Sequence, residues 1–174
     1  MQAIDNEVLR HALQWLRETR PWLCTIVHTL GSSPRPVGSV VAITDDGRQV
    51  GSVSGGCVEE DLLERLRTGA FSGARPELIE YGVSAQENER LGLPCGGRLT
   101  LLLQRLVAED HAWLQQALDA LERRHCIERR LDMLTGNTGT APVEHFMPLE
   151  INERQLRQCF GPRLRMLLVA AGQL

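Results

Sequence analysis

The segment WLCTIVHTL (Trp22–Leu30) is apolar and β-branched along nearly its whole length, which is typical of a strand buried on both faces. The segment after it, GSSPRPVG at 31–38, contains two prolines that favour an extended or turned loop. Residues 39–44 and 49–54 then predict a hairpin around the turn sequence Asp45-Asp46-Gly47. A buried strand, a loop and a hairpin in direct succession indicate that this part of the chain forms a sheet.

Apolar residues at helical spacing predict three longer helices, and shorter apolar runs predict the remaining strands. The helices are expected over residues 5–19, 58–68 and 110–123. Further elements are strands over 76–81, 98–103 and 126–134, an irregular polar stretch over 82–93, and a short helix over 152–159 that Gly161-Pro162 ends. We therefore expect an α/β fold in which a mixed β-sheet is flanked by helices.

The last residues predict the opening of a different fold. MLLVAAGQL at 166–174 is typical of the first strand of a Rossmann unit running into its glycine turn. A lone strand has no partner to pair with. We therefore expect either a chain cut at this point or a strand that packs on the preceding domain, and in both cases an incomplete Rossmann unit.

The composition limits the possible functions. The chain has 174 residues, of which 43% are apolar and 24% charged, as in a single globular domain or slightly more. Its net charge of −3 provides no broad basic face, so we expect no nucleic acid as a partner. No apolar run approaches the roughly 20 residues of a membrane span, and the N-terminus lacks a signal peptide. We therefore expect a cytoplasmic protein without a membrane association.

The five cysteines, at positions 24, 57, 95, 126 and 159, are odd in number and irregular in spacing. This pattern predicts reduced thiols rather than a disulfide framework. No C-x-x-C pair is present, which argues against a zinc site and against a thioredoxin-like redox centre. The chain also has no lysine, which excludes Schiff-base chemistry and a P-loop.

Two mirrored clusters are the strongest chemical signal in the sequence: GGC at 55–57 and CGG at 95–97. Paired glycines let a ligand approach main-chain N–H groups closely. The helix that follows Cys57 directs its N-terminus to the same place, which favours an anion and lowers a thiol pKa. The carboxylates at 59–61 oppose both effects. The alternative interpretation is that both clusters are tight turns whose cysteines are small buried apolar residues.

Arg35 is the second candidate, because prolines on both sides hold its backbone. A guanidinium presented from a stiff loop suits a phosphate or a carboxylate, although an exposed turn arginine explains this residue equally well. Ser33 and Ser54 add hydroxyl groups near the same strand ends.

Three segments together, GSSPRPVG at 31–38, GSVSGGCVE at 51–59 and GLPCGG at 92–97, closely resemble the XdhC/CoxI family. Members of this family are accessory proteins of xanthine dehydrogenase and related molybdenum hydroxylases. The resemblance implies a binding protein without turnover. Such a protein holds the molybdenum cofactor (molybdopterin), delivers it to a xanthine dehydrogenase-type molybdenum hydroxylase and interacts with a cysteine desulfurase. Ala170 replaces the first glycine of the family's Gly-Ala-Gly turn, so NAD(P) is not expected to bind this chain.

The resemblance predicts an XdhC/CoxI-like cofactor-binding domain over 1–105, a helix–strand extension over 106–162 and the start of a truncated Rossmann domain over 163–174. We expect Cys57 and Cys95 to meet at the rim of one sheet and to contact the molybdenum or its sulfido group, with the 31–38 loop closing over the pterin. The expected cofactor-binding residues are Cys57, Cys95, Gly55, Gly56, Gly96, Gly97, Arg35, Ser33 and Ser54. The alternatives are a sulfur carrier that holds a persulfide and a docking module with inert cysteines. A homodimer is compatible with each of them.

Overall fold

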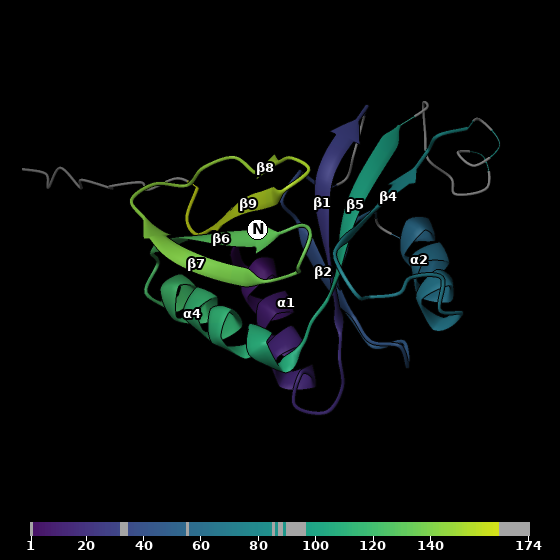
Figure 1. The fold of residues 1–174 in the computed structure, drawn as a ribbon. Helices are drawn as coiled ribbons and strands as arrows, with labels where there is room; N and C mark the ends of the chain where they lie inside the picture. Colours follow the sequence, from purple (N-terminus) through teal and green to yellow (C-terminus); the bar gives the residue numbers. More distant parts are fainter. Residues whose placement is uncertain are drawn as a thin grey trace, which may run out of the picture.

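The computed structural model describes residues 2–31, 35–54, 56–84, 86, 89 and 97–163, and Figure 1 shows their arrangement. The strands of this part form a five-stranded sheet and a four-stranded sheet, and every described strand pair is antiparallel. Helices pack against the sheets, which confirms the predicted α/β class. The predicted single mixed sheet is corrected, because the described strands divide between two antiparallel sheets.

The five-stranded sheet has the order β3-β2-β1-β5-β4. Its strands are β1 (Trp22–Leu30), β2 (Val40–Ile43), β3 (Gln49–Gly51), β4 (Glu77–Tyr81) and β5 (Arg98–Arg105). The strand β1 lies in the middle of the sheet and pairs with β2 on one side and β5 on the other. This position explains the apolar character of β1, because a central strand covered on both faces has no solvent-facing side.

Two helices cover the two faces of this sheet. The helix α2 (Cys57–Arg67) packs on the face that carries Trp22, Cys24 and Ile26. The helix α1 (Gln2–Trp15) packs on the opposite face, against Leu23 and its neighbours. Alternate residues of β1 therefore belong to two separate hydrophobic clusters, as the two-residue period of a strand requires.

The four-stranded sheet has the order β7-β6-β9-β8 and lies on the α1 side of the molecule (Figure 1). Its strands are β6 (Cys126–Asp132), β7 (Thr138–Val143), β8 (Glu150–Ile151) and β9 (Gln155–Phe160). A short 3₁₀ helix, η2 (Ala108–Asp110), leads into α4 (His111–Glu122). The helix α4 buries the apolar side chains Trp113, Leu114, Ala117, Leu118 and Leu121.

The short helix predicted over residues 152–159 is wrong, because this stretch is the turn between β8 and β9 followed by β9 itself. The Asn152 side-chain oxygen accepts hydrogen bonds from the main-chain N–H groups of Arg154 and Gln155, at 2.9 Å each. Asparagine forms such a turn as readily as it caps a helix. Pairing with β6 then holds the following residues in an extended conformation. The strand β7 was not predicted either, since its sequence contains Gly139 and Pro142.

Two predicted features lie largely or wholly outside the described residues. These are the Rossmann strand over 166–174 and most of the irregular stretch over 82–93. The proposed domain boundary near residue 105 stays a prediction.

Candidate functional site

The three glycine-containing segments leave the five-stranded sheet at the same end. We call them the first (31–38), second (51–59) and third (92–97) glycine segments. The first segment follows the end of β1 at Leu30, and Leu30 pairs with Arg98, where β5 begins directly after the third segment. The second segment follows the end of β3 at Gly51, which pairs with Val41 near the start of β2. Because neighbouring strands are antiparallel, each of these strand ends faces the same edge of the sheet.

The first and third segments approach each other closely at this edge. Gly31 has a positive φ of 78°, which glycine adopts without strain. A Cβ atom added to Gly31 would lie 3.4 Å from the Cα atom of Gly97. Gly97 is buried. The predicted site residue Gly97 therefore lies next to the beginning of the first segment.

The helix α2 points its N-terminus toward the same edge. Near its other end, the Arg67 guanidinium donates a hydrogen bond of 3.3 Å to the main-chain oxygen of Asp46. Asp46 lies in the turn between β2 and β3, at the opposite end of the sheet. Figure 1 shows α2 running along the sheet between these two ends. Cys57 is the first residue of α2, so the main chain of this predicted site residue lies on the side of the glycine segments.

Glu59 organises the second glycine segment. Its carboxylate is buried and accepts hydrogen bonds from the main-chain N–H groups of Val53 (2.9 Å), Ser54 (3.0 Å) and Gly56 (3.0 Å). The hydroxyl of Ser52 donates a further bond of 2.7 Å, and the hydroxyl of Ser54 also donates to this carboxylate. Burial raises the pKa of Glu59, but these hydrogen bonds outweigh burial and lower the pKa to about 2.

The position of Glu59 decides what the loop offers to a ligand. The N–H group of Gly56, expected to face a ligand, donates to Glu59 instead. Gly56 itself is exposed and has a φ of 153°. Ser54, another predicted site residue, likewise supports the loop through Glu59. The sequence carried a signal for this role, because a glutamate at the third helical position typically bonds back to the residue that precedes the helix.

The remaining predicted site residues fall into two groups. Arg35 is half-buried in the described part of the first segment. Ser33, Gly55, Cys95 and Gly96 lie outside the described residues. The proximity of the Cys57 and Cys95 sulfur atoms therefore stays a prediction.

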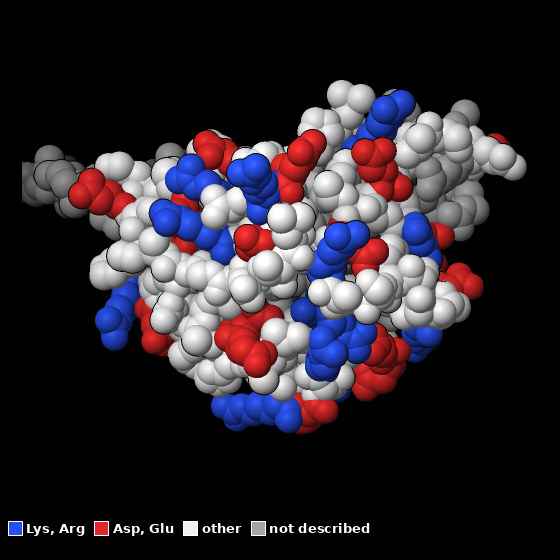
Figure 2. Space-filling view, in the orientation of Figure 1, with Lys and Arg blue, Asp and Glu red and all other residues white. Residues whose placement is uncertain are grey.

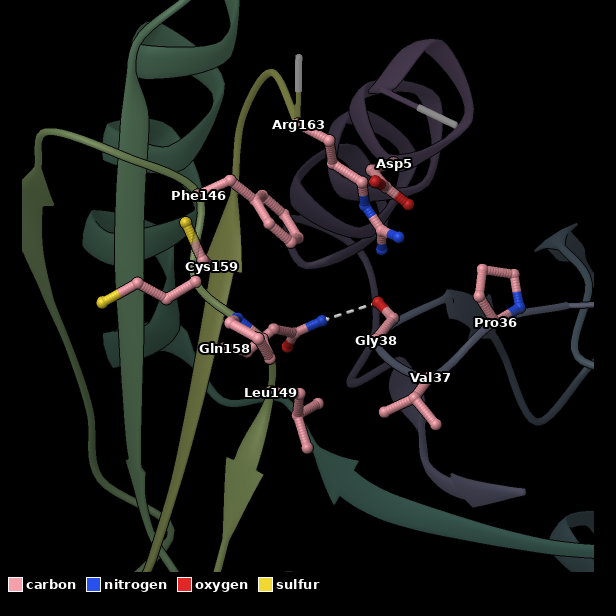
Figure 3. Close-up of a pocket in the computed structure, with 11 residues that line it drawn as sticks. Asp5, Pro36, Val37, Gly38, Phe146, Leu149, Gln158, Cys159 and Arg163 are labelled. Atoms are coloured by element: carbon pink, nitrogen blue, oxygen red, sulfur yellow. Dashed lines mark hydrogen bonds between the residues drawn. The ribbon is translucent and has the colours of Figure 1, made fainter. Parts of the chain in front are cut away.

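A cavity of about 330 Å³ lies beside the first glycine segment, between the two sheets (Figure 3). Its walls come from α1, the first glycine segment, the loop before β8, β9 and the residues after it. The lining residues are Asp5, Pro36, Val37, Gly38, Phe146, Met147, Pro148, Leu149, Gln158, Cys159 and Arg163. The sequence gives no local signal for this cavity, because its walls are far apart along the chain.

The charged groups of the cavity are Asp5 and Arg163, whose side chains lie close together in Figure 3. Burial raises the pKa of the Asp5 carboxyl to about 6, although the positive charges of the N-terminal amine, Arg163 and Arg35 oppose the shift. The Arg163 guanidinium lies 4.6 Å from the centre of the Phe146 ring, a favourable cation–π distance. An acceptor and a set of donors are thus held side by side at one end of the cavity.

A series of hydrogen bonds between buried polar side chains connects this cavity to the interior of the protein. Arg129 is fully buried and donates to Gln158 Oε1 at 2.8 Å and to the side-chain oxygen of Gln104. Its guanidinium also lies 4.8 Å from the centre of the Trp113 ring. Gln158 in turn donates through Nε2 to the main-chain oxygen of Gly38 at 3.0 Å. Arg129 and Gln158 therefore tie the first glycine segment to the four-stranded sheet.

The remaining cysteines of the described part are Cys24, Cys126 and Cys159, and all three are buried, free thiols. Burial raises the pKa of Cys24 and that of Cys159, which makes both thiols poor nucleophiles. Within the described ranges, no group of three or more His, Cys, Asp or Glu side chains is placed to hold a metal ion.

The surface seen in Figure 2 carries arginine and acidic side chains interspersed over both sheets. On this face, recognition therefore depends on individual groups rather than on one broad field of a single sign. None of the described helices is long and apolar enough to cross a membrane.

The fold and the sequence both have known counterparts. A xanthine dehydrogenase from Bacillus halodurans has a similar fold, with a TM-score of 0.64 and 21% identity over 88% of this chain and 53% of that one. Residues 14–82 match the XdhC and CoxI family. The molybdenum cofactor insertion chaperone PaoD of Escherichia coli is 35% identical over 92% of this chain and 49% of its own length. A probable xanthine dehydrogenase subunit of Bacillus subtilis is 30% identical over 86% of this chain and 52% of its own length.

The α/β fold and the three glycine segments agree with these similarities. These similarities confirm the resemblance to the XdhC and CoxI family that the motifs predicted. It spans about half the length of the curated relatives it matches.

Proposed function

We propose that this chain binds the molybdenum cofactor and hands it to a xanthine dehydrogenase-type hydroxylase. The observation that carries the proposal is the convergence of the three glycine segments, with the N-terminus of α2, on one edge of the five-stranded sheet. The similarity to a chaperone that inserts this cofactor supports the same conclusion. A cofactor that must be released again needs a site of loops and thiols rather than a closed metal cage.

The chemistry of the edge suits an anionic ligand with a soft metal. The side chains of Cys57 and Cys95 would supply thiolates, which match molybdenum or its sulfido group. The N-terminus of an eleven-residue helix and the Arg35 guanidinium favour the terminal phosphate of the cofactor. Glu59 brings a negative charge close to this helix end, but the hydrogen bonds that it accepts from Ser52, Val53, Ser54 and Gly56 compensate that charge within the loop.

Retention of the cofactor by cysteine variants tests the proposal. The protein is loaded with molybdenum cofactor, passed through a desalting column and assayed for molybdenum and pterin per chain. Cys57→Ala and Cys95→Ala should each lower the retained fraction, and the double variant should retain little. Cys126→Ala is the matched control, because this buried thiol lies in β6. Unchanged retention by a folded double variant refutes the role of the thiolates.

A second experiment asks whether the same thiols carry sulfur. The protein is incubated with a cysteine desulfurase and cysteine, and its intact mass is measured. One additional sulfur atom on Cys57 or Cys95 identifies a persulfide, and with it a role in sulfuration of the cofactor. The absence of an adduct, together with retained cofactor, assigns the chain to binding and delivery alone.

A further inference from the structure

Two charged side chains in the described wall of the cavity beside the first glycine segment, Asp5 and Arg163, are available to a ligand. The amide of Gln158 is already used on both sides, since its oxygen accepts from Arg129 and its nitrogen donates to the Gly38 main-chain oxygen. By contrast, Asp5 and Arg163 form no hydrogen bond with another described residue. Among the described residues, a carboxylate acceptor and a guanidinium donor therefore line the same cavity without a hydrogen-bond partner (Figure 3).

Much of the remaining cavity wall is apolar. Phe146, Pro36 and Pro148 supply rigid rings, and Val37, Met147 and Leu149 supply aliphatic or thioether surface. Figure 3 shows Phe146 next to Arg163 on one side and Pro36 with Val37 on the other. At about 330 Å³, the volume lies within the usual range for small-molecule sites and accommodates a bicyclic heterocycle.

We propose that this cavity binds the 2-amino-4-oxopyrimidine edge of a pterin. The ring N–H and the 2-amino group of such an edge donate hydrogen bonds to the Asp5 carboxylate, and the 4-oxo group accepts from the Arg163 guanidinium. The apolar walls contact the faces of the bicycle. This inference rests on the proposed function, and it assigns to the cavity the organic end of the same cofactor whose metal end would lie near the thiols.

Binding of free pterin, followed through quenching of its intrinsic fluorescence, tests the assignment. The wild-type chain should bind pterin, and Asp5→Asn should weaken binding about tenfold or more, because a charge-assisted pair of hydrogen bonds is lost. Glu7→Gln is the matched control, since Glu7 is an exposed carboxylate on the same helix. Circular dichroism establishes that each variant is folded.

Two related ligands sharpen the test. Lumazine carries a 2-oxo group in place of the 2-amino group and would direct this oxygen at Asp5, so the wild type should bind it at least tenfold more weakly than pterin. Asp5→Asn should lose most of this discrimination, which a merely structural role of Asp5 would leave intact. Guanosine carries the same edge on a purine and should bind more weakly than pterin.

The outcomes separate this inference from the proposed function. Equal binding of pterin and lumazine, tighter binding of guanosine, or no binding of pterin overturns the assignment, even where the whole cofactor is retained through Cys57 and Cys95. Pterin binding with the expected discrimination upholds it. If such a protein nevertheless retains no molybdenum cofactor, the proposed function fails on its own test.

Discussion

The two sheets of this molecule differ in where they keep their polar chemistry. The five-stranded sheet buries apolar side chains on both faces, under α1 and α2, and the strand ends that flank its glycine segments lie at one edge. The four-stranded sheet instead buries a charge, Arg129, between itself and β5. The five-stranded sheet thus offers a ligand loops on a rigid support. The four-stranded sheet holds the first glycine segment in place through the hydrogen bond from Gln158 to the main-chain oxygen of Gly38.

The largest expected effect comes from the buried charge. Arg129→Met should lower the free energy of unfolding by about 4 kcal/mol, because it leaves the buried side-chain oxygens of Gln104 and Gln158 without a donor, at roughly 2 kcal/mol each. Urea denaturation measures this loss. Arg123→Met, at an exposed position, is the control and should change stability by less than about 0.5 kcal/mol. Equal stability of both variants would contradict the role given to Arg129.

The second largest effect is expected at Glu59, which supports the second glycine segment beside the five-stranded sheet. Glu59→Gln should lower the free energy of unfolding by about 3 kcal/mol at neutral pH. The lowered pKa of Glu59, about 2 against an ordinary value of 4.5, corresponds to stabilisation of this size. The matched control is Glu60→Gln, an exposed neighbour on the same helix. Thermal or urea denaturation distinguishes the two variants.

The same group predicts a pH dependence with a definite sign. The folded pKa of Glu59 lies below the unfolded value, so its contribution is complete above about pH 4.5 and is lost as the pH falls toward 2. The wild type should therefore lose more stability than Glu59→Gln in this window. Parallel stability curves for the two proteins between pH 5 and about pH 2.5 are incompatible with this account.

A smaller loss of stability is expected at Gln158, which links the four-stranded sheet to the first glycine segment. Gln158→Met keeps the volume of the side chain but removes its hydrogen bonds to Gly38 and Arg129. We expect a loss of about 2 kcal/mol and faster amide hydrogen exchange at residues 37–39. Gln115→Met on the exposed face of α4 provides the comparison. Unchanged exchange at 37–39 would mean that the loop does not depend on the second sheet.

The smallest effect is expected where α1 and α4 meet at the surface. Arg10 and Glu122 form an ion pair of 3.4 Å, with 60% and 61% of their side chains exposed. Such pairs contribute little because water and salt screen them. Arg10→Ala should change the free energy of unfolding by less than about 1 kcal/mol, as urea denaturation can show. A larger loss of unfolding free energy would mean that this ion pair contributes to the packing of α1 against α4.

The sequence predicted the elements whose signals are local. The bounds of β1 are confirmed, and α2 and α4 lie within one residue of the predicted ranges 58–68 and 110–123. The predicted helix over 152–159 is wrong because its apolar residues also fit a strand, and only pairing with β6 selects between the two. The local sequence of such a short apolar segment after an asparagine does not decide between a helix and a strand.

The site was predictable in its parts but not in its assembly. The motifs identified the glycine segments, and strand register then explains why they share one edge. The sequence also left open whether the acidic residues after Cys57 would point toward a ligand, and the structure directs Glu59 into its own loop. The cavity lined by Asp5 and Arg163 depends on contacts between distant segments, which no local pattern records.

The central claim is that the first turn of α2 and the third glycine segment face one another across a single site. Cross-linking Cys57 to Cys95 tests it most directly, because Cys24, Cys126 and Cys159 are buried and react slowly. The folded protein is treated with a short bis-maleimide and digested, and the linked peptides are identified by mass spectrometry. We predict a Cys57–Cys95 link as the main product. Efficient single labelling of both thiols, with no linked peptide, would contradict the account.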